Sequence, residues 1–548
     1  MLKVVGASWL QTRISTYILV AVALLGIGAI ILGEFGHVEQ DGTYSATVSW
    51  NHKGGYRIDF WGQGNDLNAV PLHAARAYYK TGIFEHGWSF IEIETSSKYP
   101  DTVQAYAAGL LEGSLTWQLI HHHWYNTVRA ECEKKVAECR KLTRYLRDNT
   151  AVIRERAELL ESTDPFWHMV RLFYTQLDGL EAGWKFAVRR SRVSVSLESE
   201  DFLWLALASD VPGFQRAFNI SDVPLSSMIY LKSLPRDNSE PLIAVGHNTA
   251  SSYMQMLRLL KKYTFGYHVL PGIKTAASTP TRSIVMSSYP GALSSQDEFY
   301  LLRGENRELV VTGTSLLATN HSNWSFLFPK DHVMSSARLM AANRLATDGQ
   351  SWFETMSHQN GGASAAQWIT LEPRSTTILL VEQLPSLTVA INYTEEFKKN
   401  GYLIYSGISN FENVDEIVRP AKKDVNEWRD RLARAQENVT TFEQFRHMMR
   451  GCSQEDCTAD NLNLKVDPLK ELTYRGDLEV EPVPYGIVDT KVLAVNADGF
   501  EIFETFSGPA TLQSRPPFKW SETFPNISHI GHPDTFDFES VTHRWVWV

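Results

Sequence analysis

Cysteine is scarce in this sequence: the 548 residues contain four, at Cys132, Cys139, Cys452 and Cys457. An even count in a protein that enters an oxidising compartment predicts two local disulfides rather than a metal site, and it leaves no thiol as a nucleophile. Cys132 and Cys139 lie in a segment of helical pattern, where a rise of 1.5 Å per residue would hold their Cα atoms about 10 Å apart. A disulfide needs a separation below about 7 Å, so pairing requires the helix to break between them. Cys452 and Cys457 bracket a short polar loop and can pair without such a break.

The sequence also lacks the features of nucleic-acid-binding proteins and of the common metal and cofactor enzymes. Its formal net charge is −10 and no segment concentrates basic residues, which excludes nucleic acid as a partner. No nucleophile elbow, paired-histidine zinc helix, phosphate-binding loop or dinucleotide fingerprint is present. The run His121–His123 cannot converge on one ion, because successive helical residues point about 100° apart. The segment His529–Asp534 could ligate a metal or relay protons, but spacing identifies no carboxylate partner for it. The sequence therefore predicts no metal and no cofactor.

One long apolar run is present, the uncharged segment over residues 14–33. Lys3 and Arg13 precede it, which is the charge pattern of a signal sequence. The run is also long enough to span a bilayer, so two interpretations stay open: a cleaved signal peptide within residues 1–36, or an uncleaved type II anchor. Both place the rest of the chain in the secretory lumen, either secreted or lysosomal.

Acceptor sites for N-linked glycans agree with a luminal location. The Asn-x-Ser/Thr pattern occurs at six positions: Asn219, Asn320, Asn323, Asn392, Asn438 and Asn526. A few such sites arise by chance in a chain of this length, but six behind a signal-like segment predict a glycosylated protein.

Hydrophobic periodicity predicts a mixture of helices and strands. Residues 44–61 alternate apolar and polar side chains around a Lys-Gly-Gly turn, which predicts a β-hairpin. Apolar spacings of three and four predict helices within 74–161 and 166–187, and again over 250–265 and 332–356.

The part of the chain between these helices and the C-terminus is richer in strands. A linker is expected from about residue 190 to residue 226, and short β-type runs begin at Met228. Strands interrupted by helices are typical of an α+β layered sandwich. The segment from Asp467 to the end is rich in proline and aromatic residues and is expected to wrap around the body.

Five blocks of sequence carry a resemblance to a known family. They are Glu112–Ile120, Gly246–Arg258, Ser287–Leu302, Asn343–Trp352 and Pro516–Asp534. Together they resemble the phospholipase B-like family, and their departures from its pattern resemble the insect lamina ancestor branch. The resemblance covers the chain from about residue 45 to its end. It implies an N-terminal nucleophile hydrolase fold, a four-layer αββα sandwich that cleaves ester or amide bonds, with a lipid substrate according to the family name.

The resemblance also implies a site of self-cleavage. In this family the precursor is cut before a cysteine that becomes the nucleophile, and the freed α-amine, which titrates near pH 8, acts as the base. The family motif is approximately Gly-Ser-Cys-Ser-Ala-Leu-Ile-Lys, and counting back from the shared Lys232 puts Ser227 at the cysteine position. A shift of one residue would select Ser226 instead. The implied products are a small chain of residues 37–226 and a large chain of residues 227–548.

Several neighbouring positions depart from the family pattern. His247 and Thr249 of the family's His-x-Thr-Trp motif are kept, whereas the tryptophan is Ala250. The family's asparagine pair, which could supply oxyanion-hole or substrate-binding amides, is replaced by Ala365 and Ala366. Loss of one oxyanion-hole donor typically lowers the rate by about 10²–10³.

Two further roles and two functions remain open at this point. Arg434 matches a family arginine that could contact a substrate carboxylate or phosphate, or it could be an exposed helical arginine. His247 could line the substrate pocket or be structural. The chain is then either a hydrolase that uses Ser227, or a catalytically impaired luminal glycoprotein that binds a lipid or a protein partner.

Overall fold

The computed structural model describes most of the chain. The described residues are 16–24, 42–61, 66–221, 226–236, 240–272, 276–316, 332–360, 365–385, 387–411, 414, 433, 436–450, 473–511 and 515–547. Two units are distinguished, residues 1–41 and residues 42–548. In the first unit residues 16–24 are helical, and the rest of the predicted signal or anchor segment lies outside the described residues. No helix in the described part of the chain is both long and apolar enough to cross a bilayer.

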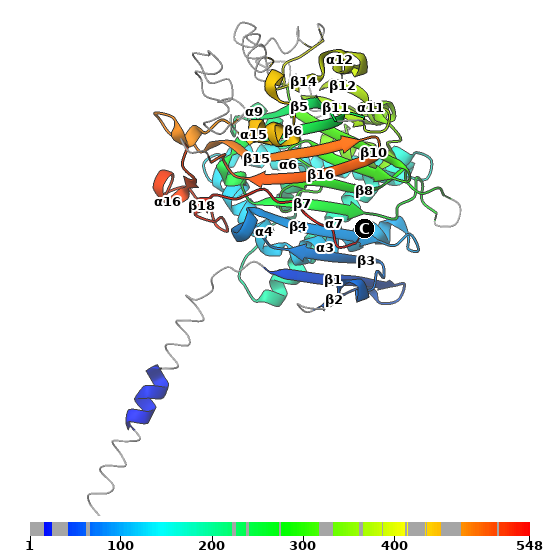
Figure 1. The fold of residues 1–548 in the computed structure, drawn as a ribbon. Helices are drawn as coiled ribbons and strands as arrows, with labels where there is room; N and C mark the ends of the chain where they lie inside the picture. Colours follow the sequence, from blue (N-terminus) through cyan, green and yellow to red (C-terminus); the bar gives the residue numbers. More distant parts are fainter. Residues whose placement is uncertain are drawn as a thin grey trace, which may run out of the picture. The chain divides into compact units, whose positions relative to one another are not determined.

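The second unit contains an 11-stranded sheet with the strand order β13-β12-β11-β10-β9-β8-β7-β4-β3-β1-β2 (Figure 1). Neighbouring strands are antiparallel except β4 and β7, which are parallel. The strands are β1 (Thr43–Asn51), β2 (Gly55–Trp61), β3 (Ala75–Lys80), β4 (Trp88–Thr95), β7 (Arg258–Thr264), β8 (Thr281–Ser288), β9 (Phe299–Gly304), β10 (Arg307–Ser315), β11 (Ala366–Glu372), β12 (Thr377–Leu384) and β13 (Leu387–Asn392). The predicted hairpin over residues 44–61 is confirmed as β1 and β2.

A smaller antiparallel sheet of five strands has the order β14-β5-β6-β15-β16. Its strands are β5 (Ser226–Leu234), β6 (Leu242–Ser252), β14 (Tyr402–Tyr405), β15 (Tyr485–Asn496) and β16 (Gly499–Ser507). A third, two-stranded sheet pairs β17 (Phe518–Lys519) with β18 (Thr535–Phe536).

The two main sheets pack face to face. Alternate residues of β5 point to opposite faces of the small sheet and belong to two different apolar clusters. Ile229 and Leu231 belong to an apolar cluster with Val310 and other residues of the large sheet. Met228 and Tyr230 point the other way and pack with helix α15 (Phe442–Arg450). The small sheet is therefore covered by the large sheet on one face and by α15 on the other.

Helices cover the outer face of the large sheet and bury the largest apolar cluster against it. They include α3 (Asp101–Leu115), α6 (Val136–Leu160), α7 (Pro165–Ser191), α10 (Ser335–Leu345) and α11 (Gly349–Ser357). The other helices are α2 (Ile83–His86), α4 (Trp117–Trp124), α5 (Ala130–Cys132), α8 (Ser199–Ala206), α9 (Val211–Ala217), α12 (Thr394–Asn400) and α16 (Trp520–Thr523), with short turns η1 (Leu67–Ala69), η2 (Tyr125–Arg129), η3 (Tyr253–Gln255), η5 (Gln436–Asn438) and η6 (Gly476–Leu478). The α+β sandwich is thus observed, with helix, sheet, sheet and helix in succession.

Helices α3 and α7 lie so close that their backbones touch. A Cβ atom added at Gly113 would overlap the carbonyl oxygen of Leu180, and one added at Gly183 would overlap that of Leu110. Glycine lets two helices approach at this distance because it carries no side chain. This contact fixes the helical layer on which the large sheet rests.

Two of the four predicted helical regions are confirmed and two need correction. Residues 166–187 fall within α7, and α10 and α11 form within residues 332–356. The helical region over 74–161 begins too early, since β3 and β4 precede α3, and residues 250–265 contain the end of β6, η3 and β7. The charged residues of β7 are buried in ion pairs: Arg258 with Asp297, Lys261 with Glu112 and Lys262 with Glu92.

The expected linker region contains two helices, α8 and α9, with buried apolar side chains such as Phe202 and Phe214. The C-terminal segment lies against the large sheet, where Glu92 of β4 accepts hydrogen bonds from the backbone nitrogens of Val546 and Trp547 at 2.7 and 3.3 Å. Lys262 of β7 donates to the Trp547 carbonyl oxygen. The N-terminal strands β1 to β4 belong to the large sheet, and the C-terminal residues Val546 and Trp547 are hydrogen-bonded to the same sheet.

The disulfide between Cys132 and Cys139 is present, with the Cα atoms 5.7 Å apart. Helix α5 ends at Cys132 and α6 begins at Val136, so the helix breaks where the pairing required it to break. The predicted pair Cys452–Cys457 lies outside the described residues.

Candidate functional site

Polar side chains form rows across the inward face of the small sheet. The register pairs Ser227 of β5 with Thr249 of β6, and Thr249 with Asp489 of β15. The next inward row contains His247 and Lys491, which are also paired in the register. Because side chains alternate along a strand, these residues face the large sheet like their apolar neighbours. The sheet thus changes from apolar to polar near the start of β5.

Hydrogen bonds join these rows within the small sheet. The Lys491 Nζ atom donates to the Thr249 Oγ1 atom at 2.8 Å and to the Asp489 Oδ1 atom at 2.6 Å. All three side chains are fully buried, and Ser227 is 5% exposed. A cationic nitrogen therefore lies beside a hydroxyl group in the same row as the Ser227 hydroxyl group.

The large sheet completes the cluster with two more charges. Arg258 of β7 is ion-paired to Asp297, and its Nη2 atom lies 2.5 Å from the Asp489 Oδ2 atom. Lys491 lies 3.8 Å from Asp297. Tyr289 donates its hydroxyl proton to Asp297 at 2.8 Å, and the Arg258 guanidinium lies 4.2 Å from the centre of its ring. Two cations and two carboxylates thus balance one another between the sheets.

Burial and these neighbours shift several pKa values. Burial opposes ionisation of Asp297, but Arg258 and Lys491 outweigh it and hold the pKa of that carboxyl below its ordinary value. Burial lowers the pKa of Lys491, although Asp489 and Asp297 counteract the shift. Burial, and then the charge of Lys491, holds the pKa of His247 well below its ordinary value, so the imidazole is neutral.

The strand β10 of the large sheet holds the backbone of Ser227. The Ser227 nitrogen donates to the Thr314 Oγ1 atom at 3.1 Å, and the same hydroxyl donates to the Ser227 carbonyl oxygen at 2.7 Å. The His247 Nε2 atom is hydrogen-bonded to the Gly313 carbonyl oxygen at 3.0 Å. These contacts fix the start of β5 against the opposite sheet.

The structure brings together three of the four residues predicted from sequence. Ser227, His247 and Thr249 lie in adjacent rows, whereas Arg434 lies outside the described residues. The replaced asparagine pair is close by, since Ala366 is paired with Ser315, the residue that follows Thr314. Both Ala365 and Ala366 are buried.

The charged members of the cluster, Arg258, Asp297, Asp489 and Lys491, were not predicted from the sequence. A signal for two of them was present in β15, where Asp489 and Lys491 alternate in phase with the buried Leu493 and Val495. A charged residue at one of the alternate positions of a strand that otherwise carry buried apolar side chains indicates a buried, ion-paired group.

The histidine-rich segments do not assemble a metal site in the described parts of the chain, where no group of three or more metal-binding side chains is found. His529 and His532 instead pack against Trp520, with ring centres 4.7 and 5.6 Å away. His123 stacks on Tyr289 at 5.2 Å. Burial, and then a neighbouring histidine charge, lowers the pKa of His122 to about 4.

The predicted glycan acceptors within the described residues are accessible. Four asparagine side chains are exposed: Asn219, Asn392, Asn438 and Asn526. Asn320 and Asn323 lie outside the described residues. The exposure permits glycosylation, which remains a prediction.

Comparisons with known proteins give consistent results. The family described as Phospholipase B matches residues 75–543, which include the whole polar cluster. A phospholipase B-like lamina ancestor protein of Drosophila melanogaster is 30% identical over 100% of both chains. Phospholipase B-like 2 of Homo sapiens is 30% identical over 87% of this chain and 86% of its own. Phospholipase B-like protein B of Dictyostelium discoideum is 28% identical, over 87% and 86% respectively.

Proposed function

The chain belongs to the phospholipase B family, and on that premise we propose that it is a lipid hydrolase of the N-terminal nucleophile type with Ser227 as nucleophile. Ester or amide bonds are the targets, and no cofactor takes part. The observation that carries the proposal is the position of Ser227 at the start of β5, in one row with Thr249, whose hydroxyl group accepts a hydrogen bond from Lys491. A nucleophile of this type must begin a chain and face a polar, water-poor site.

Self-cleavage would proceed from the intact peptide. The Ser227 Oγ atom attacks the carbonyl carbon of Ser226, the peptide C–N bond breaks, and the hydroxyl proton passes to the released nitrogen. Water then hydrolyses the resulting ester, which leaves a carboxylate on Ser226 and a free amine and hydroxyl group on Ser227. Thr314, which already contacts the Ser227 nitrogen, would hold the new amine.

Lipid hydrolysis would reuse the same hydroxyl group. The α-amine takes the Ser227 proton as the Oγ atom attacks the ester carbonyl carbon, and it passes that proton to the departing alcohol. Water then releases the fatty acid and restores the hydroxyl group. Arg434 is a candidate for contact with a substrate carboxylate or phosphate. His247, held neutral and bonded to the β10 backbone, supports the strand beside the nucleophile.

A second candidate function has specific support. Ala365 and Ala366 lie beside the segment that contacts Ser227, at positions where the family pattern has amide side chains. Without these donors an oxyanion would lose stabilisation, so we also consider a luminal glycoprotein that binds lipid or a protein without cleaving it. In both cases we place the protein in the secretory pathway, secreted or lysosomal.

The experiment that tests the proposal is N-terminal sequencing of the purified mature protein. We expect a fragment that begins at Ser227, and its disappearance in Ser227→Ala. Ser226→Ala is the matched control and should still be cut, which also decides the register. Ser227→Cys should be cut and should retain esterase activity. A single uncut chain without esterase or amidase activity would refute the hydrolase and favour the binding protein.

A further inference from the structure

A recess lies beside the polar cluster, between η2, α5, α8, α9, η3 and the loop that joins β8 to β9. Its cavity volume is about 40 Å³, and it is partly open to solvent. Its polar lining includes His123, Glu131, Gln215, Gln255 and Gln296. Trp204 and Tyr289 contribute aromatic side chains. The other lining residues are a mixture of apolar and polar ones: Asn126, Thr127, Val128, Leu205, Ala208, Val211, Ser252, Met254 and Ala292.

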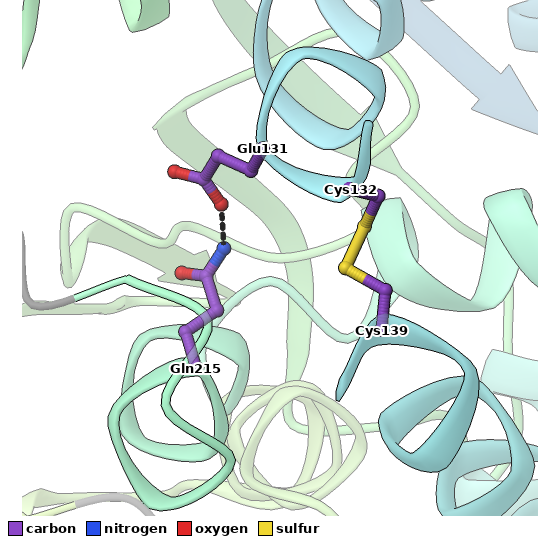
Figure 2. The surroundings of a disulfide bond; sticks show 4 residues. All are labelled: Glu131, Cys132, Cys139 and Gln215. Carbon is purple, nitrogen blue, oxygen red and sulfur yellow. Dashed lines mark hydrogen bonds between the residues drawn. A yellow bond between two sulfur atoms is a disulfide. The ribbon is translucent and has the colours of Figure 1, made fainter. Parts of the chain in front are cut away.

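The disulfide places Glu131 in this wall. Glu131 precedes Cys132 at the end of α5, where the bridge to Cys139 turns the chain into α6 (Figure 2). Gln215 of α9 points toward Glu131 from the opposite side and donates its amide hydrogen to the carboxyl group. The carboxyl group is therefore held by a covalent constraint on one side and a hydrogen bond on the other.

Among the described residues of the lining, Glu131 is the only acidic side chain, and no lysine or arginine is present. Burial raises the pKa of Glu131 to about 7, although a hydrogen bond from Ser221 and the charge of Lys134 oppose the shift. Burial lowers the pKa of His123 to about 3, with smaller contributions from Arg258 and Lys261, so the imidazole is neutral. The His123 Nδ1 atom is buried and has no hydrogen-bond partner in the part of the chain that the structure describes.

These charges select the class of ligand. A phosphate or carboxylate would find no cation among the described lining residues, whereas a cation would compensate the buried carboxylate. The amides of Gln255 and Gln296 can donate to and accept from polar groups attached to that cation. The apolar and aromatic walls suit an alkyl substituent rather than a hydrated metal ion.

We propose that the recess binds an alkylammonium group, of the kind carried by amine-containing phospholipid head groups. Its identification as a lipid subsite rests on the proposed function. The position supports it, because Ser252, which lines the recess, ends the same strand that carries Thr249. Tyr289 belongs to both places, since its ring lines the recess and its hydroxyl group binds Asp297.

Binding of two matched probes to the full chain tests this inference. Choline carries a quaternary ammonium, and 3,3-dimethylbutanol has the same shape without the charge. At about pH 8 calorimetry should show choline binding at least about tenfold more tightly than the neutral alcohol. Because a protonated Glu131 carries no charge, choline affinity should fall by up to about tenfold per pH unit below pH 7. The neutral alcohol should show no such dependence.

Variants identify the group responsible. Glu131→Gln should abolish both the preference for choline and its pH dependence. Glu133→Gln is the control, because Glu133 is exposed and paired with Arg129 outside the recess. Equal affinity for the two probes, no binding of either, or an unchanged preference in Glu131→Gln would overturn the inference. The wild-type comparison needs no variant, so a folding defect in Glu131→Gln leaves the test decisive.

The outcome is separable from that of the proposed function. Choline binding is measured in the wild type and in Ser227→Ala, neither of which must turn over a substrate. Selective choline binding by a chain that is never cut would support the recess and refute the hydrolase. Hydrolysis without choline binding would do the reverse.

Discussion

Replacement of the buried His123 by phenylalanine should make the protein less sensitive to acid. The ring stacks on Tyr289 at 5.2 Å with an interplanar angle of 18°, an arrangement that phenylalanine can keep. The Nδ1 atom has no hydrogen-bond partner among the described residues, so its removal breaks no hydrogen bond to them. The main change is then the loss of a titrating group.

The sign and size of the effect follow from proton linkage. Burial lowers the pKa of His123 to about 3 from an ordinary value of 6.5, so between these pH values the unfolded chain binds a proton that the folded chain does not. Stability therefore falls as the pH falls through 6.5. At pH 5 the difference of about 1.5 pH units corresponds to about 2 kcal/mol of unfolding free energy.

Urea unfolding at about pH 7.5 and pH 5 measures this quantity. The wild type should lose about 2 kcal/mol more than His123→Phe between the two conditions. Other buried histidines, such as His122, are present in both proteins, so their contributions to the pH dependence of stability cancel in the comparison. His52→Phe is the control, because His52 is exposed, and it should behave like the wild type. Equal losses in the wild type and His123→Phe would show that His123 is protonated inside the fold and would refute the reasoning.

Two further predictions concern the helical layer. Gly113→Leu should destabilise the fold by several kcal/mol, since even a Cβ atom there overlaps the Leu180 carbonyl oxygen, and thermal unfolding should show a large loss; an unchanged melting temperature would mean that the helices can separate without cost. Replacement of Cys132 and Cys139 together by alanine should cost about 2 kcal/mol from the short loop that they close. It should also weaken choline binding, whereas loss of stability with unchanged binding would contradict the positioning of Glu131 by the disulfide.

Sequence patterns predicted the helices and strands in which the spacing of apolar residues matches the secondary structure that forms. The hairpin of β1 and β2 forms around the predicted tight turn, and the long helix α7 forms where apolar residues recur at helical spacing. Strand β7 was mistaken for a helix because Arg258, Lys261 and Lys262 are charged yet buried. Their partners lie far away in the sequence, and pairing at such distances leaves no periodic signal.

Some residues of the candidate site could be predicted from the sequence and others could not. The family motif led to Ser227, His247 and Thr249, because the residues themselves are part of the resemblance. Asp297 lies in the loop between β8 and β9 and meets Lys491, 3.8 Å away, only through the tertiary fold, which no local pattern contains. The position of Glu131 in the recess could not be predicted, because it depends on the turn that the disulfide makes between α5 and α6. Its hydrogen-bond partner Gln215 lies in α9, a helix within the region that was expected to be a linker.

The single parallel pairing in the large sheet has a consequence for the cleaved protein. Strands β1 to β4 precede the proposed cut, whereas β7 to β13 and all of the small sheet except Ser226 of β5 follow it. The ladder from Trp88 opposite Arg258 to Glu94 opposite Thr264 would then become an interface between two polypeptides. The disulfide seen in the structure lies wholly before the cut and cannot tether them. The mature form would be an obligate heterodimer whose subunits share one sheet, and neither product would be expected to fold alone.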